Sequence, residues 1–254
     1  GKPVSRLACL AQGTCRSNYE DLAIMKSQAV ICHRVDKIFQ QGELAVHALS
    51  GIDLEIAGGG FVCLSGPSGS GKTTLLNMIG GLDRPSHGEI TVADQRIDLM
   101  RMSELAELRL RHIGFVFQAY NLIPVLNARE NVEFVMQLQG VPADERRALA
   151  MAILDEVGLK GMEERRPGEL SGGQQQRVAV ARAIVSKPAL ILADEPTANL
   201  DSATAEKLMQ QMRELNAHIG TTFVISTHDK LVMRFAKRLI KLHDGNIIDD
   251  IAQS

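Results

Sequence analysis

The sequence predicts an α/β fold built on a mostly parallel sheet. Short apolar runs, typical of strands that are covered on both faces, recur at residues 61–65, 113–117, 190–193 and 222–226. Helical patterns lie between and around these runs, at residues 130–139, 143–157, 172–186 and 203–217. Strands that alternate with helices favour a parallel sheet with right-handed crossovers.

The start of the chain differs from the rest. Residues 1–24 have no sustained hydrophobic period, and we interpret them as an extension of unknown role. A regulatory arm, a targeting peptide and an unstructured segment all fit this stretch, which lacks the long apolar core of a secretory signal. We expect the main domain to cover residues 25–254.

Two further regions follow within that domain. Strand-like segments at 29–33 and 51–56 come first, and a turn at 83–88 precedes another strand at 89–92. Residues from about 120 to 180 contain helical patterns and no convincing strand. This absence indicates a helical insertion in the α/β domain.

Composition narrows the class of protein. The 254 residues are 45% hydrophobic and 23% charged, which is ordinary for a soluble globular protein. A net charge of −2 gives no electrostatic reason to expect nucleic acid as a partner. No apolar run approaches the ~20 residues that a membrane-spanning helix needs. The four cysteines (Cys9, Cys15, Cys32 and Cys63) show no CxxC pair, so we expect the protein to be in the reducing cytosol. Cys63 lies within an apolar run, where we expect a small buried thiol.

A phosphate-binding loop follows the apolar run at 61–65. The residues fit G-x-x-x-x-G-K-[ST] between a strand and a helix, and they are Gly66, Pro67, Ser68, Gly69, Ser70, Gly71, Lys72 and Thr73. Backbone N–H groups of such a loop surround phosphate oxygens, and the helix that starts near Lys72 adds its dipole. We expect Lys72 to neutralise the β- and γ-phosphates and Thr73 to bind Mg²⁺. The loop alone leaves open whether the protein is a kinase, a GTPase or an ATPase.

Two acids end the apolar run at 190–193. Asp194 lies at the expected carboxyl end of that strand, where it can reach Mg²⁺ through the water shell of the ion. By strand alternation Glu195 points the other way, toward the γ-phosphate, where it can polarise an attacking water. A solvated turn acid is the alternative, and the phosphate loop upstream favours the functional interpretation.

A second helix start has the features of an anion site. Ser171 can cap the helix at 172–186, and Gly172 and Gly173 expose backbone amides at its positive end before Gln174. A plain glycine turn is the usual explanation of such a segment by itself. Here the chain has two anion-binding helix starts but one complete nucleotide loop.

Taken together, these motifs resemble those of ATP-binding cassette (ABC) ATPases over roughly residues 28–250. Residues 170–174 read LSGGQ, which is similar to the signature of that family, and residues 66–73 and 190–195 resemble its Walker A and Walker B motifs. Gln118 matches the Q-loop glutamine, residues 199–201 the D-loop, and His228 the switch histidine. The resemblance implies a P-loop NTPase of ABC ATPase type, with an N-terminal antiparallel β subdomain and a helical subdomain.

The resemblance also implies roles for further residues. It extends the nucleotide contacts to Thr74, lets Gln118 contact Mg²⁺, and lets His228 hold the γ-phosphate and the attacking water. Phe39 lies where the family usually has the aromatic residue that stacks on adenine, and a core position is the alternative. The D-loop has Ala198 and Asn199, where the family commonly has Gly or Ser at one of the two positions, but Asp201 is kept and would couple the two sites.

The partners follow from the same resemblance. Two cassettes pack head to tail, so Ser171 and Gly173 of a second copy would hold the γ-phosphate of ATP bound at the Walker A loop. Residues 81–90, 113–124, 128–134 and 170–184 are similar to the LolD, MacB and FtsE group, whose members pair with a membrane permease. We therefore expect a cytoplasmic ATPase that is peripheral on the inner face of the cell membrane.

Two other classes compete with this hypothesis. Non-transport cassettes that act in DNA repair, chromosome maintenance or translation usually carry a long coiled-coil insertion or a second cassette, and neither is seen here. A non-hydrolysing regulatory cassette typically lacks the residue at Glu195 or His228, and both are present. The sequence therefore favours the energy-coupling ATPase of a transporter or mechanotransmission complex.

Overall fold

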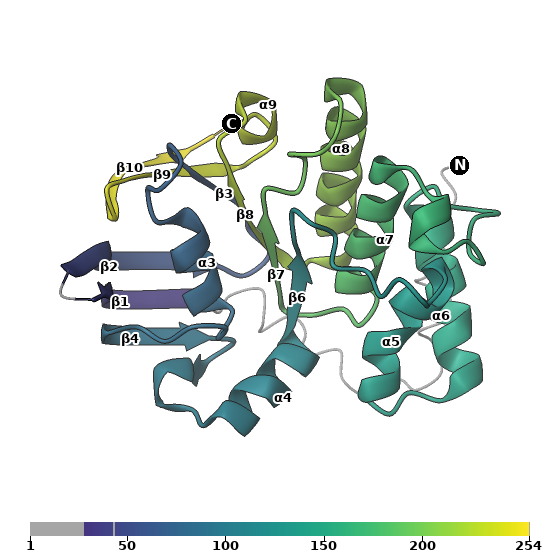
Figure 1. The fold of residues 1–254 in the computed structure, drawn as a ribbon, viewed down its shortest axis with the longest axis horizontal. Coiled ribbons are helices and arrows are strands. Elements are labelled where there is room, and N and C mark those ends of the chain that lie inside the picture. The colour runs from purple at the N-terminus through teal and green to yellow at the C-terminus, as the bar shows by residue number, and fades with distance from the viewer. Residues whose placement is uncertain (1–27, 43, 254) are drawn as a thin grey trace.

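The computed structural model describes residues 28–42 and 44–253 as two sheets with flanking helices (Figure 1). The extension expected at residues 1–24, with Cys9 and Cys15, lies outside the described residues. The first sheet is antiparallel, with strand order β2-β1-β4-β5. Its strands are β1 (Gln28–Gln41), β2 (Leu44–Ala57), β4 (His87–Val92) and β5 (Gln95–Arg96).

The second sheet is the mostly parallel sheet that the sequence predicts. Its order is β10-β9-β3-β8-β7-β6, and all neighbouring strands are parallel except the pair β9 and β10. The strands are β3 (Phe61–Ser65), β6 (Ile113–Val116), β7 (Leu190–Asp194), β8 (Thr222–Thr227), β9 (Arg238–His243) and β10 (Asn246–Ala252).

Helices cover both faces of this sheet. In Figure 1, α3 lies between the two sheets, α5 and α6 lie on the right, and α7 lies between them and α8. The helices are α3 (Lys72–Ile79), α4 (Met102–His112), α5 (Ala128–Leu138), α6 (Ala143–Glu156), α7 (Gly172–Ile184), α8 (Ser202–Ile219) and α9 (Lys230–Met233). Two short 3₁₀ turns, η1 (Ile97–Leu99) and η2 (Pro167–Glu169), complete the described elements.

Strand alternation divides the core into two halves. Phe61, Ile191 and Phe223 belong to the cluster on the side of α7 and α8, and the Phe61 and Phe223 ring centroids lie 5.3 Å apart. Their neighbours Val62 and Leu192 belong to the cluster on the side of α3. Successive side chains of a strand point to opposite faces, so a continuous apolar run fills both halves.

The helical insertion expected at about 120–180 is present: α5, α6 and α7 pack together, and the described chain from 117 to 189 contains no strand. Asn131 fixes the entry to α5 because its fully buried amide donates to the Ile123 and Leu126 carbonyls and accepts from the Ile123 N–H. Arg129 adds ion pairs to Glu133 and Glu164. The insertion is therefore held by polar contacts as well as by its apolar core.

Several elements were not expected from the sequence. The hairpin of β9 and β10 was missed because much of β10 is exposed and gives no apolar run, although Asp244 and Gly245 form a typical hairpin turn. α4 was missed because only Leu105 and Leu108 of its residues are buried. The exposed first half of β2 is held by backbone pairing with β1 and not by burial, so it has no hydrophobic signal.

The parallel strands determine where a site can form. β3, β6, β7 and β8 are neighbours or near neighbours, and their carboxyl ends meet at one edge of the sheet. In open α/β sheets ligands bind in the crevice outside this edge. Each of the four strands is followed at this edge by a motif that the sequence analysis singled out.

Candidate active site

The phosphate loop joins β3 to α3 in a backbone shape that requires glycine. Gly71 has φ 99°, and a Cβ there would lie 2.7 Å from the Ala48 carbonyl oxygen. At Gly66 a Cβ would lie 2.2 Å from the Leu242 carbonyl oxygen. Residues with side chains rarely adopt a positive φ, so the glycines let the chain turn tightly between strand and helix.

Lys72 lies over this loop. It is the first residue of α3, only 7% exposed, and its Nζ donates to the carbonyl oxygens of Gly66 and Pro67 at 2.8 and 2.9 Å. The ammonium group is therefore held on the inner side of the loop. An anion bound by the loop amides would meet it directly.

Asp194 faces the phosphate loop from the end of β7. The Thr73 hydroxyl donates to both Asp194 carboxylate oxygens, at 3.1 Å each. Ser226, at the matching position of β8, also donates its hydroxyl to Asp194 Oδ1. A hydroxyl and a carboxylate are thus brought together, and oxygen atoms are the ligands that a hard divalent cation prefers.

Glu195 directly follows β7. Strand alternation is the wrong explanation for its direction, because the residue lies past the strand in a left-handed conformation with φ 45°. Its N–H donates to the Ser226 carbonyl oxygen at 3.0 Å. Glu195 Oε2 accepts from the Thr227 hydroxyl at 3.0 Å, and Oε1 lies 2.7 Å from His228 Nδ1. The end of β8 therefore holds both carboxylate oxygens.

These groups surround one cavity. It has a volume of about 520 Å³, and its walls include Lys72, Thr73, Gln118, Glu195 and His228. The Glu195 side chain is 16% exposed and the His228 side chain is 70% exposed, so the carboxylate is sheltered and the imidazole forms the rim. A sheltered carboxylate next to a lysine-capped phosphate loop is suited to activating a water beside a bound phosphate.

Cys63 is a buried residue of β3 that does not line this cavity, and its thiol has no catalytic role there. Burial, together with the smaller effect of the nearby Glu195 charge, raises the pKa of the Cys63 thiol to about 12. A thiol with such a pKa stays protonated and is a poor nucleophile. The structure therefore agrees with the expectation of a small buried side chain in β3.

The signature segment has a local structural role in this chain. The Ser171 hydroxyl accepts from the Gln174 N–H at 3.3 Å, and the Gln174 side chain accepts from the Ser171 N–H at 2.8 Å. This capping box leaves the Gly172 and Gly173 amides at the start of α7, where a helix offers no acceptor. A Cβ at Gly173 would lie 2.7 Å from the Thr204 methyl group, so close packing also requires glycine there.

Not all the expected site residues lie together. Residues 67–74, Gln118, Glu195 and His228 line the cavity, and Asp194 contacts Thr73 beside it. Ser171, Gly172, Gly173 and Gln174 do not line it. Asp201 does not line it either; it caps α8 by accepting from the Thr204 N–H, and hydrogen bonds from Thr204 lower the pKa of the Asp201 carboxyl.

Phe39 lies on β1, outside the set of residues that line the cavity. Its side chain is 39% exposed, so the alternative that Phe39 is a core residue is wrong. The Lys37 ammonium lies 4.8 Å from the centre of its ring and is held there by Asp83 at 2.7 Å. One ring face is therefore occupied by a cation, and a base could stack only on the other.

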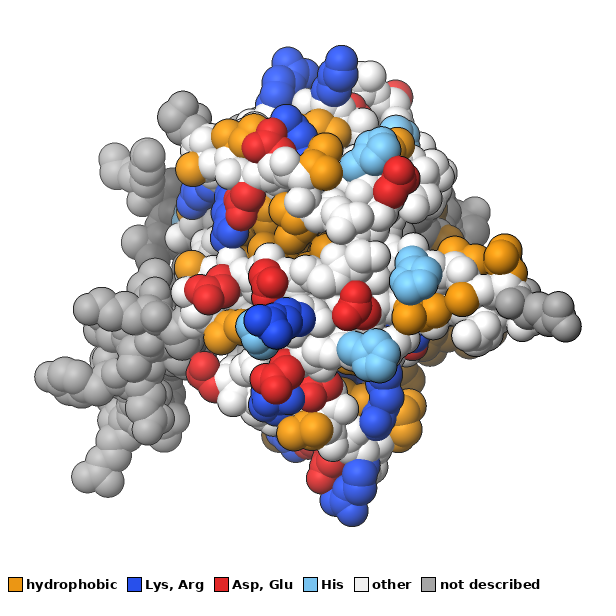
Figure 2. All heavy atoms as spheres, turned by 90° about the vertical axis from the view of Figure 1, so that its left-hand side faces the viewer, with side chains coloured by type: hydrophobic (Ala, Val, Ile, Leu, Met, Phe, Trp, Pro, Cys, Tyr) orange, Lys and Arg blue, Asp and Glu red, His pale blue; other side chains and the backbone are white. Residues whose placement is uncertain are grey.

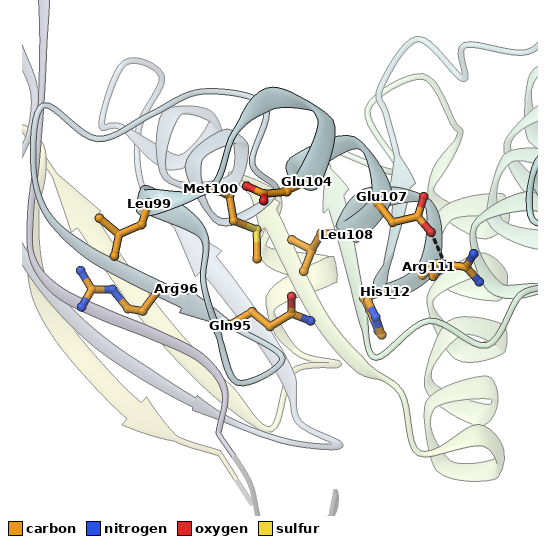
Figure 3. Close-up of a pocket in the computed structure, with 9 residues that line it drawn as sticks. All are labelled: Gln95, Arg96, Leu99, Met100, Glu104, Glu107, Leu108, Arg111 and His112. Atoms are coloured by element: carbon orange, nitrogen blue, oxygen red, sulfur yellow. Dashed lines mark hydrogen bonds and ion pairs between the residues drawn. The ribbon is translucent and has the colours of Figure 1, made fainter.

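A second pocket among the described residues lacks the same chemistry. The pocket in Figure 3 has a volume of about 420 Å³ and lies between residues 95–100 and α4. Its charged side chains are paired with acids or bases of the chain, Arg111 with Glu107 and Arg96 with Asp98. These pairs leave little free charge to bind a phosphate group.

The face that carries the antiparallel sheet offers no continuous basic surface. Figure 2 shows acidic and basic side chains interspersed on it. On the antiparallel sheet itself, Arg96 of β5 forms an ion pair with Glu89 of β4. This face would not attract a polyanion by charge alone.

Sequence reasoning missed three residues at the site. Ser226 and Thr227 hold the two acids through their hydroxyls, and Ala48 of β2 forms part of the cavity wall. The sequence contained a signal for Ser226 and Thr227, because both are polar residues at the end of an otherwise apolar strand. That strand is paired with another strand that ends in acids. Ala48 gave no signal because small apolar residues occur everywhere.

The phosphate loop between β3 and α3, with the acids after β7, defines the class of the protein as a P-loop NTPase. The comparisons narrow this further. The family model described as ABC transporter matches residues 49–198. One similar solved structure is the cassette MJ0796 of Methanocaldococcus jannaschii, described as a dimer in a post-hydrolysis state bound to ADP and Pi. Its TM-score is 0.82 and its sequence identity is 44%. The match covers 88% of this chain and 98% of the MJ0796 chain.

Named relatives support the same conclusion. The lipoprotein-releasing system ATP-binding protein LolD of Bacteroides fragilis is 48% identical over 204 residues, which are 80% of this chain and 94% of that protein. The macrolide export ATP-binding/permease protein MacB of Brucella melitensis is 46% identical over 214 residues, which are 84% of this chain and 33% of that protein. The chain belongs to the ABC transporter family, and its expected similarity to LolD and MacB is confirmed.

Among the described residues, none of the helices combines the length and the apolar character that crossing a lipid bilayer requires.

Proposed function

We propose that this ABC ATPase couples ATP hydrolysis to work by a membrane permease, and that it hydrolyses ATP as a head-to-tail homodimer. The observation that supports this most directly is the convergence of Lys72, Gln118, Glu195 and His228 on one cavity. The cassette spans residues 25–254, with residues from about 120 to 180 as its helical subdomain.

ATP binds with its phosphates in the loop from Gly66 to Thr74. The loop amides and the Lys72 ammonium hold the β- and γ-phosphates, and adenine stacks on the free face of Phe39. The contact between Thr73 and Asp194 fits Mg²⁺, because both residues offer oxygen atoms next to the loop. Thr73 and Gln118 would bind the ion and Asp194 would hold it through water. Mg²⁺ supplies charge neutralisation at the phosphate oxygens when it is bound.

Glu195 is the general base. One carboxylate oxygen accepts from Thr227 and the other is 2.7 Å from His228 Nδ1, so the carboxylate is fixed in orientation. It takes a proton from the water that attacks the γ-phosphate. His228 holds that phosphate and water through its second ring nitrogen.

The signature of a second copy completes the site. Ser171 to Gln174 lie outside the cavity of their own chain, and the Gly172 and Gly173 amides are available at a helix start. In a head-to-tail dimer these groups would meet the γ-phosphate held by the partner loop. Asp201 would couple the two sites. The solved relative MJ0796 is described as a dimer.

The non-transport alternative has no support. The residues between Lys72 and Ser171 form short elements, and the longest helix among them, α6, has 14 residues. The named relatives are ABC transporter ATP-binding proteins. A long coiled-coil arm is therefore absent from this part of the described chain.

The permease binds at the helical subdomain. Through this partner the protein lies at the inner face of the cell membrane. Phe134 and Leu138 are exposed apolar side chains one turn apart on α5, at 38% and 58% exposure. Phe134→Glu with Leu138→Glu should abolish co-purification with the permease in detergent and leave ATP turnover intact. Met151→Glu is the matched control, because Met151 on α6 is 39% exposed. Permease retained by the double variant would contradict this docking surface.

The nucleotide chemistry is tested by two substitutions. Glu195→Gln should lower kcat by about 10²–10⁴-fold, because the general base is lost while the shape is kept. It should also accumulate an ATP-bound dimer on gel filtration. Lys72→Ala should lose tight ATP binding or turnover. A Glu195→Gln variant that stays monomeric at every ATP concentration would rule out the sandwich dimer.

A further inference from the structure

The backbone that follows Gln118 has an unusual shape. Tyr120 and Asn121 are consecutive residues in the left-handed region, with φ 60° and 49°. In this region the Cβ of any residue crowds the backbone; asparagine tolerates it because its short polar side chain can form local hydrogen bonds, whereas tyrosine adopts it rarely. Local hydrogen bonds close the turn, from the Tyr120 N–H to the Phe117 carbonyl and from the Asn121 N–H to the Ala119 carbonyl. Such a turn persists only where its surroundings hold it.

The side chain of Arg182 stabilises this turn by hydrogen bonds. It lies in the last turn of α7, and its guanidinium donates to the Asn121 carbonyl at 2.6 Å and to the Tyr120 carbonyl at 2.9 Å. The fork of an arginine can reach two neighbouring acceptors at once, whereas the ammonium group of a lysine is a point charge. No carboxylate in the described part of the chain forms an ion pair with Arg182, so these carbonyls are its polar partners.

The other end of the segment is also tied. Asn199 Nδ2 donates to the Gln118 carbonyl oxygen at 2.9 Å. Residues 118–121 are thus held by Asn199 before α8 and by Arg182 at the end of α7, while Gln118 lines the cavity. Figure 1 shows the connection from β6 to α5 running past α7. The position of Gln118 therefore depends on residues outside the cavity.

We propose that Arg182 is a positioning residue for Gln118: by holding two carbonyls of a strained turn, it fixes the backbone from which Gln118 reaches the nucleotide. This inference rests on the proposed function, because it takes Gln118 to act in ATP hydrolysis. Arg182 touches neither the cavity nor the loop from Gly66 to Thr74. Its loss should affect turnover and leave nucleotide affinity nearly unchanged.

The test is Arg182→Lys, which keeps the charge and the aliphatic stem but loses the fork. We expect kcat for ATP to fall about 10- to 100-fold, as for a small misplacement of a reacting group. KM and the affinity for ADP should stay within about twofold, because the loop and Lys72 are unchanged. Amide hydrogen exchange at residues 118–122 should become about tenfold faster, because hydrogen bonds that hold this segment are lost.

The control is Arg109→Lys. Arg109 also donates to a backbone carbonyl, but to that of Gly81, at 2.6 Å, and not to one in residues 118–121. It should leave both kcat and exchange at 118–122 unchanged. Urea unfolding of each variant accompanies the assays. If Arg182→Lys unfolds at a much lower urea concentration than the wild type, Arg182→Gln replaces it. Hydrogen exchange is then compared at a temperature at which the variant and the wild type are both folded.

A double-mutant cycle separates positioning from a general structural effect. In a Gln118→Ala background, Arg182→Lys should cause little further loss of kcat, because residues that act as a unit are not additive. Losses that multiply would overturn the proposal, and so would unchanged exchange at residues 118–122. Wild-type turnover of Gln118→Ala alone would instead contradict the proposed function of Gln118.

Discussion

His228 Nδ1 lies 2.7 Å from Glu195 Oε1, and these two residues come from the ends of neighbouring parallel strands. An ionised carboxylate only accepts hydrogen bonds, so Nδ1 of the imidazole carries the proton in this contact. The second ring nitrogen is then directed to other partners. The carboxylate and the imidazole therefore orient each other.

Thr227 provides a first test of this orientation. Its buried hydroxyl donates to Glu195 Oε2 and accepts from the Asp229 N–H, both at 3.0 Å. Thr227→Val has nearly the same shape and lacks both bonds. We expect kcat to fall about tenfold and stability to fall by about 1–3 kcal/mol, because a buried amide loses its acceptor. Thr227→Ser should keep most of the wild-type kcat in steady-state assays and most of the wild-type stability in urea unfolding. Equal losses in the Val and Ser variants would refute this role of the hydroxyl.

Gly114 tests the packing of α7 on the parallel sheet. A Cβ at this position in β6 would lie 2.3 Å from the Ala183 carbonyl oxygen of α7. Gly114→Ala should therefore lower the free energy of unfolding by about 1–3 kcal/mol through overpacking. Gly168→Ala is the control, since no heavy atom lies within 4 Å of its added Cβ. Equal unfolding midpoints in urea for the two variants would show that the close contact does not matter.

Asp98 gives the fold a defined pH dependence. Hydrogen bonds from Arg96 and from the Ile90 N–H lower the pKa of the Asp98 carboxyl. A carboxyl with a lowered pKa in the folded state adds stability above its ordinary pKa of about 4, and this stability is lost as the pH falls through the lowered value. Asp98→Asn should thus be less stable than the wild type at pH 7.

Urea unfolding between pH 7 and pH 2 measures this effect. The difference between wild type and Asp98→Asn should shrink at the acid end, because both side chains are then neutral. Asp94→Asn serves as the control at a neighbouring acid that forms no ion pair among the described residues. A difference that stays constant with pH would mean that the charge on Asp98 does not contribute.

The two described cysteines should be inert. Burial raises the pKa of the Cys32 and Cys63 thiols to about 12 each, so almost no thiolate is present at pH 8. A Cys9→Ser, Cys15→Ser variant should therefore resist iodoacetamide while folded and react fully in urea, as followed by mass spectrometry. Rapid labelling of the folded protein would show that the core around β3 opens.

Much of the site could be predicted because its motifs follow strands with strong hydrophobic signals. The loop after residue 65 and the acids after residue 193 were found from local patterns alone. Gln118 and His228 were found through resemblance, since one polar residue after a strand carries no signal by itself. For Glu195 the argument from strand alternation was wrong, because its backbone leaves the strand conformation.

What the sequence did not reveal depends on contacts between distant segments. Arg182 and the Tyr120 carbonyl are 62 positions apart, and only the packing of α7 against the segment after β6 brings them together. The hairpin of β9 and β10 and the exposed half of β2 are stabilised by backbone pairing. Hydrophobic periodicity does not report such pairing.

The shared site is tested most directly by mixing two inactive variants. Lys72→Ala removes the loop charge of one copy, and Ser171→Arg blocks the signature of the other. In a head-to-tail dimer, a mixed pair has one site with both halves intact. Equimolar mixing should therefore restore ATP turnover that neither variant shows alone, up to about a quarter of the wild-type rate if half of the dimers are mixed. Turnover that stays at the level of the separate variants would contradict a nucleotide site built from two chains.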